Sequence, residues 1–306
     1  EQNELAKEKS ELQSTLESES RLKTLMKQEL RAVSEDFGDD RRSPLVERGE
    51  AIAFSETDLM NVEPITIILS QAGWIRAAKG HDIDPKAVNF KSGDSLLASV
   101  IGRSNQNVYL QDSTGRFYAV PSHTLPSARG QGEPASGKLN LPAGATLTGM
   151  IMGEDDKEVF IGTSAGYGFR TTITDLHTKN KAGKSVVKIS PYAQVVQPKL
   201  IYDDNSLIVA VSNEGRMLVF DISNVPKLAK GKGNKIINIP SARLKRGEEW
   251  VVDYAIVGQG TSLLVYSGKR YLSLKYGDLE HYIGERGRRG HKLPRGFQRV
   301  DYLKSE

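Results

Sequence analysis

Four stretches of the sequence combine lysine or arginine with glycine, residue types that are suited to holding phosphate. The stretches are SARGQGEP from Ser127, KNKAGKS from Lys179, KLAKGKGNK from Lys227 and GERGRRGHKLPRG from Gly284, and a shorter version, AAKGHD, starts at Ala77. Cationic side chains attract an anion, and glycine lets backbone N–H groups approach it closely. A solvated loop explains one such stretch taken alone. The prediction of an anion-binding surface therefore rests on the recurrence.

Each basic stretch follows a segment that reads as a β-hairpin, and this hairpin recurs five times. Every copy has an apolar strand, a turn with a serine and a glycine, and a second strand rich in β-branched or aromatic residues. The turn glycines lie 42, 51, 49 and 53 residues apart, a period that suits four-stranded blades arranged around an axis. They are Gly73, Gly115, Gly166, Gly215 and Gly268. Glycine at a hairpin turn supplies the positive φ that such turns need.

The common position of the basic stretches predicts that they lie side by side on the outer wall of a closed ring of blades. Such an arrangement would give a track for phosphates, which we call the basic belt. Its predicted members are Lys79, Arg129, Lys181, Lys184, Lys230, Lys232, Lys235, Arg286, Arg288 and Arg289.

The charge distribution agrees with a polyanionic partner. Residues 1–40 hold 11 acidic and 6 basic side chains, which leaves 27 acidic and 36 basic side chains, a net charge of +9, over residues 41–306. A folded region with this excess favours nucleic acid first and an anionic membrane surface second. The chain has no cysteine, which agrees with a reducing compartment, and no apolar stretch near the ~18 residues that span a bilayer.

The first 37 residues read as one amphipathic helix. Leucines and other apolar residues recur every three or four positions between charged residues, and Gly38 and Pro44 follow as termination signals. We predict a helix over 1–37, a linker over 38–62 and a β domain over 63–306. The sequence begins with Glu1 in what reads as mid-helix, so we expect it to be a fragment of a longer protein.

Catalytic and metal-binding patterns are weak. GTSAG from Gly162 matches a nucleophile-elbow pattern, but that turn needs a helix directly after the serine and the residues that follow here read as a strand. The five histidines are scattered without ligand spacing. We predict no catalytic residue and no metal site in this chain.

Several long stretches resemble the C-terminal portion of the A subunit of bacterial type IIA DNA topoisomerases. They include LSQAGWIRAAKGHDID, TLPSARGQGEP, KGKGNKIINIPSA and GERGRRG, and they are more similar to topoisomerase IV than to gyrase. The resemblance implies a mainly β fold, a five-bladed β-pinwheel with strands exchanged between neighbouring blades, preceded by one long helix from the coiled-coil arm. The heptapeptide Q-R-R-G-G-K-G, by which the gyrase A subunit wraps DNA, is absent.

The resemblance also implies a function. The domain would bind and bend duplex DNA independently of sequence and present the transported segment for decatenation and supercoil relaxation. The parent would be an ATP-dependent isomerase with two A and two B subunits, in which ATP and Mg²⁺ act in other domains and in the B subunits. None of the 11 tyrosines here matches the family's nucleophile, so this fragment is expected to be non-catalytic and to need no cofactor of its own.

The alternatives are a gyrase A C-terminal domain that wraps DNA, a protein-interaction propeller whose loops bind an acidic protein, and an enzyme with a site in the central channel. The expected location is cytoplasmic and chromosome-associated, with peripheral membrane association left open.

Overall fold

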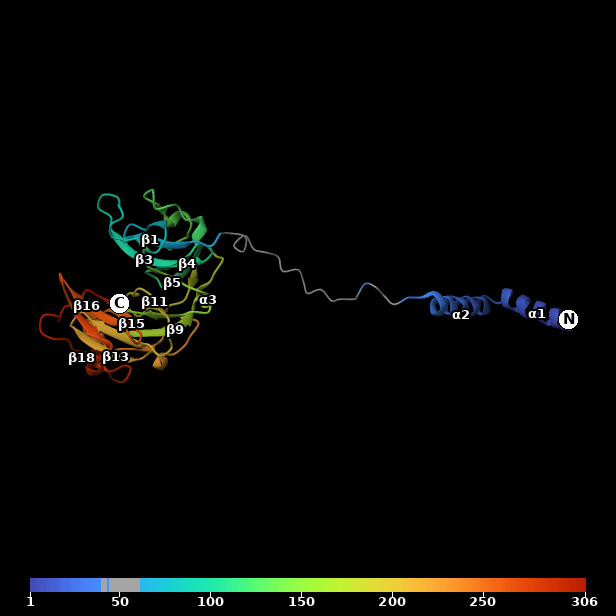
Figure 1. Ribbon diagram of the computed structural model, residues 1–306. Helices are drawn as coiled ribbons and strands as arrows, with labels where there is room; N and C mark the ends of the chain where they lie inside the picture. The colour runs from blue at the N-terminus through green and yellow to red at the C-terminus, as the bar shows by residue number, and fades with distance from the viewer. Residues whose placement is uncertain (40–42, 44–60) are drawn as a thin grey trace. The chain divides into compact units, whose positions relative to one another are not determined.

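The computed structural model describes residues 1–39, 43 and 61–306, and the chain divides into two units. One contains the N-terminal helices and the other contains all the strands, and each is described by itself (Figure 1). The predicted linker over 38–62 lies mostly outside the described residues.

The predicted single helix over 1–37 is wrong in one respect, because the structure has two helices. They are α1 (Gln2–Leu16) and α2 (Glu19–Phe37). Ser18 separates them: it has an extended backbone, and its hydroxyl accepts a hydrogen bond from the Arg21 N–H at 3.4 Å, which makes it the N-cap of α2. Serine at a helix start competes with helix continuation in this way. Gly38 ends α2 as expected.

The second unit consists of short strands joined by loops. The strands are β1 (Pro64–Ser70), β2 (Trp74–Lys79), β3 (Leu96–Arg103), β4 (Asn107–Asp112), β5 (Arg116–Pro121), β6 (Glu133–Pro134), β7 (Leu147–Met152), β8 (Glu158–Gly162), β9 (Tyr167–Thr172), β10 (Lys184–Ser185), β11 (Lys199–Ile201), β12 (Leu207–Ser212), β13 (Arg216–Asp221), β14 (Asn234–Lys235), β15 (Val251–Val257), β16 (Ser262–Ser267), β17 (Arg270–Lys275), β18 (His291–Lys292) and β19 (Tyr302–Ser305). The short helices are α3 (Ile173–Leu176), α4 (Ser241–Lys245) and 3₁₀ turns at Ser122–Thr124, Ala135–Gly137, Ile222–Asn224 and Tyr276–Tyr282.

These strands form five blades, each built on one of the predicted hairpins. The strand orders are β3-β1-β2-β6, β7-β4-β5-β10, β11-β8-β9-β14 and β15-β12-β13-β18 in blades 1 to 4, and β19-β16-β17 in blade 5. All five turn glycines have positive φ, between 60° and 82°, which confirms the reason given for glycine at these turns.

The blades pack face to face in chain order around a common axis. Hydrophobic clusters fill the space between blades 1 and 2, 2 and 3, 3 and 4, and 4 and 5. The strands β3, β7, β11, β15 and β19 contact one another in sequence, so they are the inner strands of the five blades. Alternate residues of a central strand face opposite blades, as Tyr109 and Leu110 of β4 do.

The outer strand of each of blades 1 to 4 comes from the next repeat. β6 follows the second hairpin yet pairs with β2 of blade 1, and β10, β14 and β18 repeat this exchange one blade further on each time. This confirms the predicted strand-exchanged pinwheel.

Blade 5 differs from the other four in its outer edge. Among the described residues it receives no exchanged strand, and β17 forms its outer edge. The segment after the first hairpin folds back on its own blade instead of crossing: the Arg76 guanidinium donates to the Asn89 carbonyl at 2.7 Å and lies over the Phe90 ring. The rim that the exchanged strands build is therefore an arc.

Candidate nucleic-acid interface

The four basic stretches are the segments that carry the chain from one blade to the preceding one. We call them the first to fourth crossing segments, residues 126–132, 177–183, 226–233 and 283–290, and each ends at an exchanged strand. Because the exchanged strands are the outermost strands of their blades, the crossing segments lie on the outer rim.

A glycine with positive φ ends every crossing segment, and its role is structural. A Cβ on Gly233, at φ +73°, would lie 2.2 Å from the Gly168 carbonyl oxygen of the neighbouring strand. The equivalent positions meet the backbone of the preceding blade in the same way; they are Gly132, Gly183 and Gly290. The sequence interpretation gave these glycines a phosphate-binding reason, but the crossing itself requires them.

Consecutive crossing segments lie beside one another. The Lys181 carbonyl of the second accepts the Asn140 N–H, just beyond β6, at 2.8 Å. In the third, the Gly231 carbonyl accepts the Lys188 N–H, just beyond β10, at 2.9 Å. The fourth forms backbone hydrogen bonds with residues 236 and 238, just beyond β14. Each of the second, third and fourth crossing segments is thus bonded to the chain that leaves the previous crossing. This series of contacts makes one continuous arc.

Four members of the predicted basic belt extend from this arc into solvent. They are Arg129, Lys181, Lys230 and Lys232, all exposed, and no described carboxylate forms an ion pair with them. The first, second and third crossing segments contain no acidic residue. Lys232 is held partly in place because its Nζ lies 3.9 Å from the centroid of the Tyr167 ring.

Three further members are exposed but have partners within the protein. Lys79 forms an ion pair with Glu63 at 2.8 Å, and Arg288 forms one with Glu285 at 2.9 Å. Arg286 donates to the Lys235 carbonyl at 3.2 Å. Exposed ion pairs of this kind are weak and exchange readily with other partners.

The remaining three members hold the fold together. The Lys184 ammonium donates to the Asp175 carbonyl, and hydrogen bonds from the Thr172 hydroxyl, with the charge of Lys184, hold the pKa of the Asp175 carboxyl below its usual value. Lys235 is half-buried and donates to the Asn238 side chain at 3.2 Å. Whether these residues also reach DNA stays a prediction.

Arg289 is the clearest example of a predicted belt residue whose charge is used inside the protein. Its Nη2 lies 2.5 Å from Oε2 of Glu249, a carboxylate that is 0% exposed. Arg243 reaches the same oxygen at 2.9 Å, and Nη1 of Arg289 also donates to the Asn238 carbonyl at 3.0 Å. The guanidinium compensates a buried charge, which is where loss of a partner is most damaging.

The sequence interpretation missed several exposed lysines beside the arc, among them Lys179, Lys188 and Lys245. Lys179 belongs to the second crossing segment, Lys188 lies shortly after the exchanged strand β10, and Lys245 ends α4. None of them forms an ion pair within the described part of the chain. Lys179 could have been found from its own basic stretch, whereas Lys188 and Lys245 reach the arc only through the fold.

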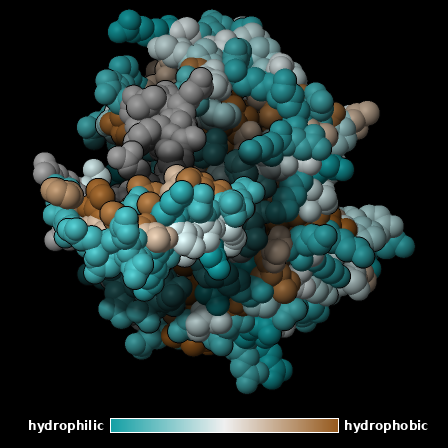
Figure 2. Space-filling model, turned by 90° about the vertical axis from the view of Figure 1, so that its right-hand side faces the viewer, coloured by the Kyte–Doolittle hydropathy of each residue, from teal (hydrophilic) through white to brown (hydrophobic). Residues whose placement is uncertain are grey.

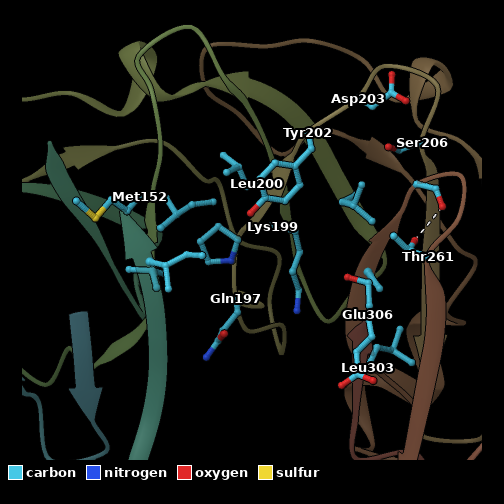
Figure 3. A pocket seen from close by; sticks show the side chains of 18 of the residues that line it. Met152, Gln197, Lys199, Leu200, Tyr202, Asp203, Ser206, Thr261, Leu303 and Glu306 are labelled. Atoms are coloured by element: carbon cyan, nitrogen blue, oxygen red, sulfur yellow. Dashed lines mark hydrogen bonds between the residues drawn. The ribbon is translucent and has the colours of Figure 1, made fainter. Parts of the chain in front are cut away.

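The axis of the domain holds a cavity of about 740 Å³ lined by inner-strand residues (Figure 3). Lys199, which points into it, forms an ion pair with Asp253 at 2.9 Å. In the described ranges no group of three or more His, Cys, Asp or Glu side chains could hold a metal ion, and no helix is long and apolar enough to cross a membrane. Figure 2 shows mostly hydrophilic residues, with hydrophobic residues scattered among them.

Comparisons with known proteins agree with this architecture. The family model of the DNA gyrase C-terminal domain, a β-propeller, matches residues 157–201 and 206–255. The A subunit of DNA topoisomerase 4 from Pseudomonas aeruginosa is 52% identical over 99% of this chain, and that from Escherichia coli strain K12 is 50% identical over 98%. The chain spans 40% of the length of either relative.

Solved structures show the same fold. The structure of the E. coli ParC C-terminal domain is 50% identical, with a TM-score of 0.69, and the match covers 80% of this chain and 99% of that one. A DNA gyrase A C-terminal domain has a TM-score of 0.59 over 78% of this chain and 81% of the other, but only 16% identity, so it supports the fold alone.

The exchanged strands and the basic rim define a five-bladed β-pinwheel domain of the type IIA topoisomerase kind. More narrowly, the chain belongs to the family of topoisomerase IV A subunits, and it corresponds to the C-terminal domain of such a subunit together with the helices that precede it.

Proposed function

We propose that this chain binds duplex DNA along the arc of crossing segments and is the non-catalytic DNA-binding part of a topoisomerase IV. The observation that carries the proposal is the series of backbone bonds between one crossing segment and the next, from which lysines without an ion-pair partner among the described residues extend. Their chemistry suits phosphates, and contacts to phosphate position a duplex without reading its sequence.

Bending of the duplex follows from the same geometry. DNA that keeps contact with successive crossing segments has to follow the curvature of the rim, and the lysines neutralise phosphates on the inner side of the bend. The parent enzyme would use the bent duplex as the segment that it transports during decatenation and relaxation. The B subunits, a second A subunit and the ATP and Mg²⁺ chemistry belong to this proposal, as does a cytoplasmic, chromosome-associated location.

Gyrase-like wrapping is less well supported. The first hairpin lacks the heptapeptide, and the segment that follows it folds back on blade 1. Identity to the gyrase structure is 16%, against 50% to the E. coli ParC C-terminal domain.

The test is the salt dependence of duplex binding. A variant with alanine at Lys179, Lys181, Lys230 and Lys232 should reduce the slope of log K against log salt by about 3 to 4, since each lost phosphate contact removes ~0.9. A matched variant with alanine at Lys7, Lys9, Lys23 and Lys27 makes the same charge change in the N-terminal helices and should leave the slope near that of the parent chain. Equal slopes for the two variants would contradict the proposal.

A further inference from the structure

One residue beside the arc has a backbone conformation that its side chain disfavours. Tyr192 has φ +63° and is the one non-glycine residue with positive φ in the described part of the chain. It is the third residue of a turn closed by the Ala193 N–H, which donates to the Ser190 carbonyl at 3.1 Å. A turn with Pro191 in second place and positive φ in third place ordinarily takes glycine there.

The internal repeats show what this turn contains elsewhere. Equivalent turns follow the exchanged strands β6 and β18 and are closed by the Ala145 N–H on Pro142 and the Phe297 N–H on Pro294. Their third residues are Gly144, at φ +75°, and Gly296, at φ +95°. Tyrosine therefore stands at one of these three turns where the other two have glycine, and it does so at the expense of backbone strain.

Packing does not explain the tyrosine. The Tyr192 side chain is 66% exposed, and the adjacent Pro191 is exposed too. A ring that stabilised the domain would be buried among apolar neighbours. Pro191 fixes its own φ and so stiffens the turn that presents the ring to solvent.

The surroundings of Tyr192 suit a nucleic acid. It borders a groove of about 800 Å³ that is also lined by Lys232 of the third crossing segment, Lys235 of β14 and Lys245 of α4. None of the lining residues is acidic. The Lys245 Nζ lies 5.9 Å from the Tyr192 ring centroid. Ser190 contributes a buried hydroxyl to the groove, and this hydroxyl has no hydrogen-bond partner among the described residues.

We propose that Tyr192 is a DNA-insertion residue. Lys232 and Lys245 hold phosphates on either side of it, and its ring enters the minor groove and stacks at one base step where the duplex bends around the rim. This inference rests on the proposed DNA-binding function and adds a base contact to an otherwise phosphate-based interface. The strained turn supplies a rigid aromatic tip, and a glycine in its place would present none.

Replacement of Tyr192 by glycine separates a DNA-binding role from a structural role because the two roles predict opposite changes in the Tm. Tyr192→Gly should raise the Tm by about 2–4 °C, since glycine accepts this φ. It should weaken binding to a 40-base-pair duplex roughly tenfold and reduce the bend measured by energy transfer between dyes at the duplex ends. The salt slope should stay unchanged, because no phosphate contact is removed. Tyr192→Phe, which keeps the ring, should bind within about twofold of the parent chain.

Wild-type affinity and bend in Tyr192→Gly, together with weakened binding in the lysine variant of the preceding section, would overturn the insertion role alone. Unchanged binding in the lysine variant would instead overturn the proposed function itself.

Discussion

The third and fourth crossing segments occupy equivalent places in the fold but hold their charge differently. In the third, Lys230 and Lys232 extend into solvent without an ion-pair partner among the described residues. In the fourth, Arg286, Arg288 and Arg289 bond a carbonyl, an exposed carboxylate and a buried carboxylate. The K-G-K-G and R-G-R-R-G patterns look alike in the sequence, yet the charge that they leave available is not the same.

The side chains themselves explain this difference. A guanidinium is planar and carries five donors, so it can bond a carboxylate and a carbonyl together, as Arg289 does. An ammonium is compact and strongly hydrated, and it stays at the surface unless a single partner is close. We therefore assign structure mainly to the arginine segment and DNA contact mainly to the lysine segments.

The largest expected effect is on stability, and it concerns the glycine that ends each of the two segments. Gly233→Ala should destabilise the domain by about 3 kcal/mol or more, because the new Cβ meets the Gly168 carbonyl and the φ is disfavoured. Gly231→Ala in the same segment, at φ +139°, has open space around its Cβ, so it should cost only the backbone strain of about 1–3 kcal/mol and less than Gly233→Ala. Urea unfolding measures both values. If they were equal, the glycine would not be required by the crossing.

The next effect tests the internal role of the fourth segment. Arg289→Ala leaves Glu249 with one arginine fewer and should lower the free energy of unfolding by about 3 kcal/mol. Arg288 also pairs with a carboxylate, that of Glu285, but both side chains are exposed. Arg288→Ala should therefore lower the free energy of unfolding by about 0.5 kcal/mol or less. A salt slope that fell more in Arg289→Ala than in the lysine variants would reverse the assignment.

A smaller effect is expected from the third segment, and on binding alone. The double variant Lys230→Ala/Lys232→Ala should weaken duplex binding roughly 10- to 100-fold at 0.1 M salt, and the slope should fall by about 2. Its free energy of unfolding should lie within about 1 kcal/mol of that of the parent chain, since the variant loses the Lys232–Tyr167 contact but no ion pair with a described carboxylate. Lys7→Ala/Lys9→Ala controls for total charge. A loss of stability with unchanged duplex binding would contradict the assignment of Lys230 and Lys232 to DNA contact.

The smallest effect is expected when an arginine of the fourth segment loses its ion-pair partner and, like the lysines of the third, becomes available to DNA. Glu285→Gln releases Arg288 from its ion pair and removes a negative charge from the rim. Duplex affinity should increase severalfold, with a rise of about 1 in the slope. Fluorescence anisotropy at several salt concentrations measures this gain, and a decrease in affinity would show that Glu285 itself orders the DNA-binding surface.

The sequence predicted the parts of the fold that depend on local pattern. Period-two strands and turn glycines located five hairpins, and the common position of the basic stretches predicted the rim. The break at Ser18 was missed because leucine spacing continues through it, and the open edge of blade 5 depends on where a distant segment pairs.

The basic belt was predicted less completely than the fold. Residue type indicates that Lys184 and Arg289 are cations, but only the three-dimensional partners, such as buried Glu249, show which cations are already bound. Lys188 and Lys245 are brought to the arc by exchange between blades, which no local pattern encodes.

The central claim is that lysines of the second and third crossing segments, without an ion-pair partner among the described residues, form one track for duplex phosphates. Acetylation of lysines with and without duplex DNA, read by mass spectrometry, tests it most directly. We predict that DNA protects Lys179, Lys181, Lys188, Lys230 and Lys232 together and leaves Lys7, Lys9 and Lys27 of the N-terminal helices as reactive as before. Protection confined to one crossing segment, or spread equally over the helices, would contradict the account.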